Sequence, residues 1–472
     1  MKRIFVTLAL ALSCLGLAQE TFLGLYLQGN KLGYSSYKQS DDQLEGKPVK
    51  RNDSRTIINA GLLGAAMQME IQAVSWTDGN GKPIKMRFVT SSAGRSQTVD
   101  ALFKGNQVLL DIVNNGALSK KTLTIPAGGQ IIDDPLTPIV SGGFSVGTSK
   151  TFYILDPTTA TLIKNEVQLK GPAEATVKGK KVSAIRVDVL DPRANTTIYL
   201  SSKGDLIKGE GPMGIEMIPE SKEEAMGETS APGYRPSIDL ALITSIKTDK
   251  PIKEPGKLGF LKMRITGRKL SRIPNDTHQA VVGSGEKWQV TVHPQRLTAS
   301  PGATIVQARA SKPGWNKPSH LIPSDSDEFK KLSAQIVAGE TNAKKAALKI
   351  KAYVQKQMSP NAGIGVLREA GEILKTKEGV CRDYAILTAT IMRAAGIPTR
   401  LASGLVNWDG NFYYHAWVEI WDGKRWLGMD STTPEPQISA AHVKLSDGNV
   451  EEAFTFTFLD KVKIEVLEAR RW

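Results

Sequence analysis

The feature that most constrains the fold is a long series of short, strand-like runs separated by tight glycine turns, from Thr21 to about Ile218. The turns are Gln28-Gly29-Asn30, Asp78-Gly79-Asn80-Gly81, Lys104-Gly105-Asn106, Lys178-Gly179-Lys180 and Ser202-Lys203-Gly204-Asp205. β-Branched and aromatic residues between such turns favour strands that pair antiparallel. We therefore predict an antiparallel sheet or half-barrel. This stretch has no histidine and no cysteine, and its carboxylates are scattered, so it shows no catalytic pattern.

The chain of 472 residues is about three times longer than the ~150 residues of a typical domain, which predicts two or three domains. Its 40% hydrophobic and 23% charged residues are typical of globular proteins, and exclude disordered, collagen-like and coiled-coil classes. Composition shifts and Pro/Gly-rich stretches predict four mature segments. These are a β-rich N-terminal domain (19–220), a linker (221–236), a second β-rich region (237–320) and a C-terminal domain (321–472). Strands are expected in the second region at Leu258–Thr266, Gln279–Val282 and Trp288–Val292.

The first residues have the pattern of a signal peptide. Lys2 and Arg3 precede an apolar run, Ile4–Leu17, that ends in small residues, so we expect residues 1–18 to be removed by cleavage after Ala18. The mature protein would then be exported, to the periplasm or the extracellular space. Lipoprotein anchoring through Cys14 is the less favoured alternative, because the preceding residues match such leaders poorly. No later segment has eighteen consecutive apolar residues, so no transmembrane segment is expected after cleavage.

The hydrophobic period changes to that of helices after Pro323. Capping residues in Ser324–Asp327 precede apolar residues at helical spacing, and a second helix is expected over Asn342–Met358. Its lysines are expected to be mostly solvated rather than to form a nucleic-acid site; they are Lys344, Lys345, Lys349, Lys351 and Lys356. The net charge of +14 leaves an anionic cell-envelope component open as a partner, and no nucleic-acid partner is expected.

Cys381 is the only cysteine left once the leader is removed, so no intramolecular disulfide is expected. It precedes an apolar segment, Tyr384–Ala395, that has the pattern of a buried helix. A thiol at a helix N-terminus is stabilised as a thiolate by unpaired N–H groups and the helix dipole, which is what a nucleophilic cysteine requires. The alternative is a small buried hydrophobic residue. Asp383, two residues on, is expected to cap the helix rather than to act in catalysis.

A histidine and an acid lie in the two arms of a predicted hairpin downstream. Asp422-Gly423 is typical of a two-residue turn. That turn would place His415 directly opposite Asp430, and Trp417 opposite Gly428. An acid beside an imidazole fixes its tautomer and stabilises its protonated form. The other histidines have no metal-ligand spacing, and no phosphate-binding or dinucleotide-binding glycine motif is present, so neither a metal nor a cofactor is expected; those histidines are His278, His293, His320 and His442.

Three blocks, in this order, carry a resemblance to a known family. They are Gly379-Val380-Cys381-Arg382-Asp383-Tyr384-Ala385, Arg393-Ala394-Ala395-Gly396-Ile397-Pro398-Thr399-Arg400, and His415-Ala416-Trp417-Val418-Glu419 with Asp430-Ser431-Thr432. The stretch Leu321–Pro434 resembles the bacterial transglutaminase-like superfamily. The resemblance implies that Cys381 is the nucleophile, His415 the general base and Asp430 the orienting acid. The implied fold is an α+β papain-like transglutaminase core at the C-terminus, preceded by antiparallel β-rich domains.

The same resemblance implies acyl transfer on peptide or protein amides through a thioester, without a cofactor. Water as acceptor would make a peptidase or amidase, which we favour, and a lysine amine as acceptor would make a cross-linking transglutaminase. A cell-envelope binding or scaffold protein whose triad does not turn over is a third interpretation, because about two thirds of the chain has no catalytic pattern. Trp408 and Tyr413 are the expected substrate-groove residues.

Overall fold

The computed structural model describes residues 20–114, 116–140, 144–192, 195–227, 236, 238–267, 273–294, 296–297, 302–364, 366–453 and 462–472. The predicted signal peptide and Cys14 lie outside these residues. The chain divides into two compact units. The first comprises Met1–Leu240 with Gly363–Val366, and the second comprises Ala241–Ala362 with Leu367–Trp472.

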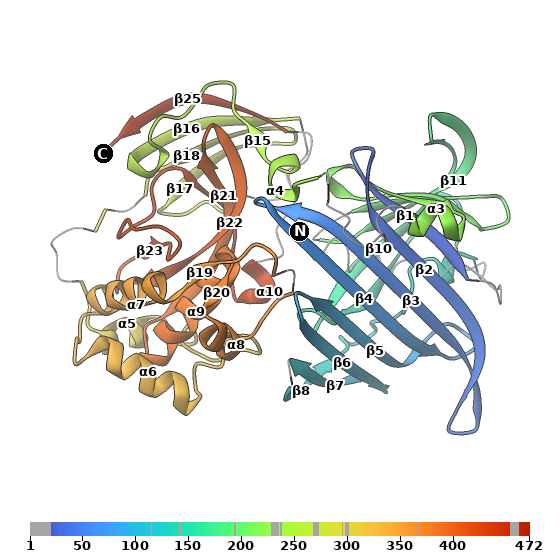
Figure 1. Cartoon of the computed structure of the whole chain (residues 1–472), viewed down its shortest axis with the longest axis horizontal. Coiled ribbons are helices and arrows are strands. Elements are labelled where there is room, and N and C mark those ends of the chain that lie inside the picture. The colour runs from blue at the N-terminus through green and yellow to red at the C-terminus, as the bar shows by residue number, and fades with distance from the viewer. Residues whose placement is uncertain are drawn as a thin grey trace. The chain divides into compact units, whose positions relative to one another are not determined.

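The first unit is built on one fourteen-stranded antiparallel sheet, whose long strands β2 to β4 lie side by side in Figure 1. Its strands are β1 (Thr21–Leu27), β2 (Asn30–Leu44), β3 (Lys47–Leu62), β4 (Ala65–Thr77), β5 (Pro83–Ser92), β6 (Arg95–Lys104), β7 (Gln107–Asn114), β8 (Ala117–Thr124), β9 (Ser149–Asp156), β10 (Thr161–Val177), β11 (Lys180–Leu190), β12 (Thr196–Leu200), β13 (Leu206–Glu210) and β14 (Ile215–Glu220). Two meanders, β1 to β8 and β9 to β14, join where β1 pairs with β14. The predicted antiparallel β-rich region is confirmed.

Glycine turns connect these strands as the sequence predicts. Gln28 and Gly29, between β1 and β2, have φ values of 50° and 82°, and Lys178 and Gly179, between β10 and β11, have 46° and 80°. Such positive φ values suit the right-handed twist of two-residue hairpins, and glycine adopts them without steric cost. The unit's short helices are α2 (Thr137–Val140), the 3₁₀ turn η1 (Pro212–Gly214) and α3 (Lys222–Met226). α3 lies within the segment 221–236 expected as a linker; residues 228–235 of that segment lie outside the described part.

The second unit contains two larger antiparallel sheets. One has the order β15-β22-β21-β24, with β23 paired to β22, and the other has the order β17-β18-β16-β25. The strands of the first are β15 (Ile246–Lys247), β21 (Thr399–Trp408), β22 (Asn411–Trp421), β23 (Trp426–Met429) and β24 (His442–Gly448). Those of the second are β16 (Leu258–Thr266), β17 (Gln279–Ser284), β18 (Lys287–Val292) and β25 (Lys463–Arg471). β16, β17 and β18 confirm the predicted strands, and β25 brings the end of the chain back beside β16.

Helices form the other part of this unit (Figure 1). They are α4 (Leu240–Ile243), the 3₁₀ turn η3 (Pro255–Lys257), α5 (Ile305–Ser311), α6 (Asp327–Val337), α7 (Ala343–Gln357), α8 (Ala370–Thr376), α9 (Cys381–Ala394) and α10 (Val450–Ala453), with the short parallel pair β19 (Ser359–Pro360) and β20 (Glu378–Gly379) before α9. α6 and α7 begin where expected, because the side chains of Ser326 and Asn342 accept hydrogen bonds from backbone N–H groups of the first turn.

The expectation that the α7 lysines are solvated is wrong for two of them. Lys344 and Lys351 are buried, and Lys351 is only 2% exposed. The Lys351 ammonium donates to the carbonyl oxygen of Thr433 at 2.5 Å. The helical period correctly places apolar residues on one face of α7. It does not show which distant groups contact the residues at the edge of that face.

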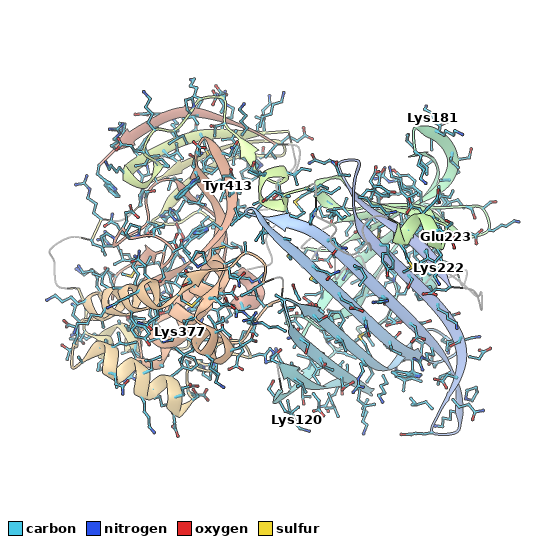
Figure 2. All side chains as sticks on the ribbon, viewed as in Figure 1. Lys120, Lys181, Lys222, Glu223, Lys377 and Tyr413 are labelled. Carbon is cyan, nitrogen blue, oxygen red and sulfur yellow. The ribbon has the colours of Figure 1, made fainter. Side chains whose placement is uncertain are left out.

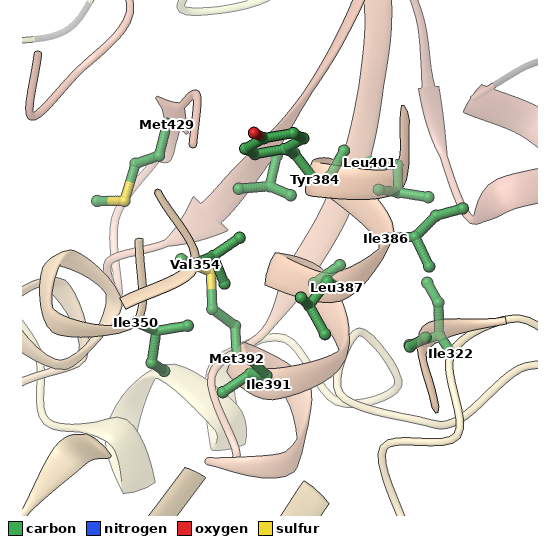
Figure 3. Close-up of a cluster of buried hydrophobic side chains, with 14 of the residues drawn as sticks. Ile322, Ile350, Val354, Tyr384, Ile386, Leu387, Ile391, Met392, Leu401 and Met429 are labelled. Atoms are coloured by element: carbon green, nitrogen blue, oxygen red, sulfur yellow. The ribbon is translucent and has the colours of Figure 1, made fainter. Parts of the chain in front are cut away.

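The core of the second unit fixes the position of α9. Its buried side chains pack with residues of α7, β21 and β23 (Figure 3), among them Ile350, Val354, Ile386, Leu387, Ile391, Met392, Leu401 and Met429. Burying each such side chain contributes about 1.5–3 kcal/mol. α9 is therefore held firmly against the sheet that carries His415. Among the described residues, no helix has the length and apolar character needed to cross a membrane.

Close approach of two strands makes Gly404 intolerant of a side chain. Gly404 lies in the middle of β21, opposite His415, and a Cβ there would overlap the carbonyl oxygen of Val443 in β24. We expect Gly404→Ala to lower the free energy of unfolding by about 1–3 kcal/mol, because overpacking shifts the backbone. Gly371→Ala in α8 is the matched control, since its Cβ would meet no atom closer than 3.4 Å. Urea unfolding of both variants tests this, and equal stabilities would contradict it.

Candidate active site

The thiol predicted to be the nucleophile lies at the start of a helix. Cys381 is the first residue of α9 and is partly exposed. The Val380 N–H donates to Asp383 Oδ2 at 2.9 Å, so Asp383 caps the helix as predicted. Asp383 is fully buried, and its other oxygen accepts from Arg368 Nε at 3.3 Å. The cap orients the first turn of α9 and, with it, Cys381.

Arg368 is a second support of this turn, and no sequence pattern pointed to it. Its guanidinium is buried and also donates to the carbonyl oxygen of Glu378 at 2.5 Å and to Thr376 Oγ1 at 3.0 Å. One planar group thus joins α8, the strand before α9 and the helix cap. A guanidinium suits this role because its donors diverge in a rigid plane.

The hairpin that carries His415 has a different register from the predicted one. Trp421 pairs with Trp426, so β22 and β23 are joined by the four-residue loop 422–425 instead of a two-residue turn. The Asp422 side chain causes this, because Oδ1 accepts from the N–H groups of Lys424 and Arg425 at 2.9 and 3.0 Å. The predicted direct pairing of His415 with Asp430 is therefore wrong.

The predicted pairing of Trp417 with Gly428 is wrong for the same reason. Gly428 faces Glu419, and the space beside its Cα is filled by Ile438. The predicted register of the hairpin differs from the observed one by two residues. Because side chains along a strand alternate with a period of two, His415 keeps the predicted face and can still reach Asp430, which directly follows β23.

The structure does bring the three predicted site residues together. His415 Nε2 donates to Asp430 Oδ2 at 2.7 Å. A hydrogen bond also links the His415 ring to Cys381, and Nδ1 is the nitrogen left for it. The Asp430 side chain is 1% exposed and that of His415 is 13% exposed. Thr432 donates to Asp430 Oδ1 through its N–H at 2.9 Å and its hydroxyl at 2.7 Å.

The electrostatics favour a thiolate and an imidazolium. Burial raises the pKa of the Cys381 thiol, but the charge of His415 and hydrogen bonds from His415 and the Ala416 backbone outweigh it, so the pKa lies below its usual value. Burial lowers the pKa of His415, yet the adjacent Asp430 and Cys381 charges hold it well above its usual value. Burial opposes ionisation of Asp430, but His415 keeps its pKa well below the usual range.

Two helices hold the loop that presents Asp430. The hydroxyls of Thr388 in α9 and Ser431 are 2.8 Å apart and buried. Lys351 of α7 holds the Thr433 carbonyl, and its buried ammonium has a lowered pKa because it is desolvated. The helix that carries the thiol thus also anchors the loop that carries the acid.

His442 is a site residue that the sequence did not single out. Its Nε2 lies 3.3 Å from Asp430 Oδ2, and its ring packs edge-on against Trp417 with centroids 5.3 Å apart. Trp417 in turn stacks beside His415, with centroids 6.5 Å apart. His442 begins β24 and shares no local motif with the other residues, so only the tertiary fold could show its place.

The predicted groove residues lie on the same face of the hairpin as His415. Tyr413, labelled in Figure 2, is two residues before His415 in β22, where it pairs with Val406 of β21. Trp408 ends β21, opposite Asn411, and is 67% exposed. Asn411, the partner of Trp408, is four residues before His415, so Trp408 lies about 13 Å farther along the hairpin than His415. Tyr413 is therefore next to His415 on this face, and Trp408 is at the outer end of the hairpin.

Two groups of side chains in the described residues have the composition of a metal site. Atoms of His415, Asp430 and His442 that could bind a metal lie within 4.8 Å of one another. His415 Nε2 and Asp430 Oδ2 are 2.7 Å apart. This is shorter than the roughly 3.3 Å between two tetrahedral ligands of zinc, so the contact is a hydrogen bond. The other group is Asp276, Glu419 and Asp447. It surrounds the ammonium of Lys444, which supplies the positive charge there.

The segment that carries Cys381, His415 and Asp430 matches a known family. Residues 330–431 match the model of the transglutaminase-like superfamily. This part of the chain belongs to that superfamily. The transglutaminase-like segment includes Cys381, His415 and Asp430, which the structure brings together. The resemblance expected from the sequence is confirmed over these residues.

Known proteins similar to this chain match parts of it. A protein-glutamine gamma-glutamyltransferase of Pseudomonas aeruginosa is 38% identical over 71 residues, 13% of this chain and 11% of that protein. An uncharacterized protein of Mycobacterium tuberculosis is 32% identical over 78 residues, 14% of this chain and 25% of that protein. The chain therefore spans a quarter or less of either relative. A crystal structure from Cytophaga hutchinsonii, provisionally assigned as a cysteine protease, has a TM-score of 0.33 and 15% identity, covering 45% of this chain and 89% of that one.

The Arg368–Asp383 contact predicts how the helix cap responds to mutation. Asp383→Ala leaves the buried Arg368 guanidinium without the nearer of its two carboxylates, so we expect the free energy of unfolding to fall by about 3–5 kcal/mol. Arg368→Met with Asp383→Ala removes both charges and should recover part of that loss. Chemical unfolding of the two variants tests this. A double variant no more stable than Asp383→Ala would show that the unpaired charge is not the cause.

Proposed function

We propose that this protein is a thiol-dependent acyl-transfer enzyme acting on peptide or protein amides. The observation that carries the proposal is the placement of Cys381 at the N-terminus of α9, hydrogen-bonded to a His415 ring whose other nitrogen donates to the buried Asp430. A nucleophile, a base and an acid that orients the base are the parts that covalent acyl transfer needs. In this proposal the core around them is papain-like, and the protein acts after export.

The mechanism follows from these positions. The Cys381 thiolate attacks the amide carbonyl carbon, and the backbone N–H of Cys381 at the helix start is a donor for the developing oxyanion. His415 then protonates the departing amine as the C–N bond breaks, which leaves a thioester on Cys381. A second nucleophile, deprotonated by His415, attacks the thioester and releases the acyl group and the thiolate. Asp430 stabilises the imidazolium whenever His415 is protonated.

Hydrolysis is the outcome we propose for the second step. Cys381 and His415 are both partly exposed, which supports access of water to the thioester. Tyr413, on the same face as His415, is proposed to contact the substrate next to the reacting bond, and Trp408 to contact it farther out. Cross-linking to an amine is the second candidate, because the matched Pseudomonas aeruginosa relative is a protein-glutamine gamma-glutamyltransferase.

The pH dependence of Cys381 alkylation tests the thiolate directly. A lowered thiol pKa makes alkylation by iodoacetamide rapid at pH values below about 8.5, the value of a free thiol. His415→Ala should shift the midpoint upward, because the charge that stabilises the thiolate is lost. Cys381 is the only cysteine after residue 18, so protein cleaved after Ala18 has one alkylation site. A slow reaction independent of His415 would contradict the proposal and favour a structural cysteine.

Turnover distinguishes the enzyme from a scaffold. On a peptide library with and without a fluorescent primary amine, we expect new peptide termini for hydrolysis and amine incorporation for cross-linking. Cys381→Ala should fold normally and abolish either product, because no thioester can form. Tyr413→Ala should reduce kcat/KM while Cys381 alkylation is unchanged. Product formation by folded Cys381→Ala would refute the mechanism.

A further inference from the structure

We infer that His442 is a positioning residue of this site, which holds the Asp430 carboxylate toward His415 by a second imidazole hydrogen bond. The inference rests on the proposed function, since Asp430 is the proposed orienting acid. It adds a fourth side chain, from a strand that the sequence motifs do not include. It also gives a role to the second β-rich region, which has none in the mechanism so far.

The Asp430 carboxylate is surrounded by four hydrogen-bond donors. Oδ1 accepts from the Thr432 N–H and hydroxyl, and Oδ2 accepts from His415 Nε2 at 2.7 Å and His442 Nε2 at 3.3 Å. An ionised carboxylate has about four accepting positions, so this set fills them. Thr432 alone would fix one oxygen and allow the other to rotate about it. The bond from His442 restricts that rotation and keeps Oδ2 at the base.

The surroundings of His442 favour the neutral ring that this bond requires. Burial lowers the pKa of His442 and is the largest effect; the nearby charge of His415 acts in the same direction, while Asp430 and a hydrogen bond to the Ser439 backbone oppose it. The buried His278 lies against the His442 backbone carbonyl, and burial lowers the pKa of His278 too. Neutral imidazole carries one N–H, and at Nε2 it faces a group that can only accept. His442 therefore donates to Asp430 without adding a charge beside the imidazolium of His415.

His442 is itself held in place from the opposite side. Its carbonyl oxygen lies 2.8 Å from Nε2 of His278, and the Gln279 side-chain amide bonds both the N–H and the carbonyl of Lys444, each at 2.8 Å. His278 and Gln279 lie where the β17 sheet begins, outside the transglutaminase-like segment. Hydrogen bonds from this short segment of the second β-rich region thus hold β24 in place next to His442.

A cluster of ion pairs around Lys444 further stabilises the position of β24. The fully buried ammonium of Lys444 contacts Asp276, lies 2.9 Å from Glu419 and lies 3.1 Å from Asp447. Arg400 bonds the same Glu419 carboxylate. Asp276 belongs to the segment that carries His278, and Glu419 belongs to the strand that carries His415. The cluster therefore fixes the distance between the two strands from which His415 and His442 project.

The test compares two replacements of His442. His442→Phe keeps a ring against Trp417 but cannot donate, whereas His442→Gln keeps an N–H group at about the place of Nε2. In His442→Phe we expect the alkylation midpoint of Cys381 to rise toward 8.5 and kcat to fall about 10- to 100-fold with KM nearly unchanged, the effect of one hydrogen bond to a charged group. His442→Gln should restore most of both. His293→Gln, at an exposed histidine of the same unit, is the control.

Each result separates the inference from the proposed function. If wild-type alkylation responds to His415→Ala but folded His442→Phe keeps the wild-type midpoint, the inference is overturned and the proposed function stands. Equal defects in His442→Phe and His442→Gln also overturn it, since packing would then be the cause. An ordinary thiol pKa in the wild type overturns both. Should His442→Phe fail to fold, His442→Asn, whose amide is too short to reach Asp430, gives the same comparison.

Discussion

A carboxylate buried as deeply as that of Asp430 costs several kcal/mol unless donors surround it, and much of the second unit supplies those donors or holds them. The Thr432 hydroxyl and N–H, His415 and His442 come from one loop and two strands. Thr388 and Lys351 fix the loop from two helices. The ionised acid in turn raises the pKa of His415, and the imidazolium lowers that of Cys381. The burial of Asp430 thus links the packing of this unit to the pKa of the Cys381 thiol.

Cys381 depends on a separate support at the other side of the site. Core packing places α9 against β21 and β22, and the Arg368–Asp383 contact sets the direction of its first turn. The position of the Cys381 thiol next to the helix N–H groups and His415 therefore depends on both the helix and the hairpin. Orientation of this kind is what makes the attack on a bound carbonyl effectively unimolecular.

The second β-rich region is part of the same unit as the site. Asp276, His278 and Gln279 contact His442 and Lys444 of β24, so residues of this region help to hold that strand in place. His442 lies in no recognisable motif, and it is contacted by His278, which is more than 160 residues away in the chain. Sequence patterns describe neighbours within a few residues, so they had no means of finding it.

The sequence by itself determined the local structure: the antiparallel strands between glycine turns, the caps of α6, α7 and α9, the placement of Cys381 at a helix start, and the shared face of His415 and Asp430. Each depends on residues a few positions apart, through backbone sterics, capping or the two-residue period of strands. Only the tertiary structure decided the register of the β22–β23 hairpin, because the side chain of Asp422 bonds the loop. It alone decided the burial of Lys351 and Arg368 and the approach of His442 to Asp430, because these depend on donors and acceptors that meet only when distant segments pack.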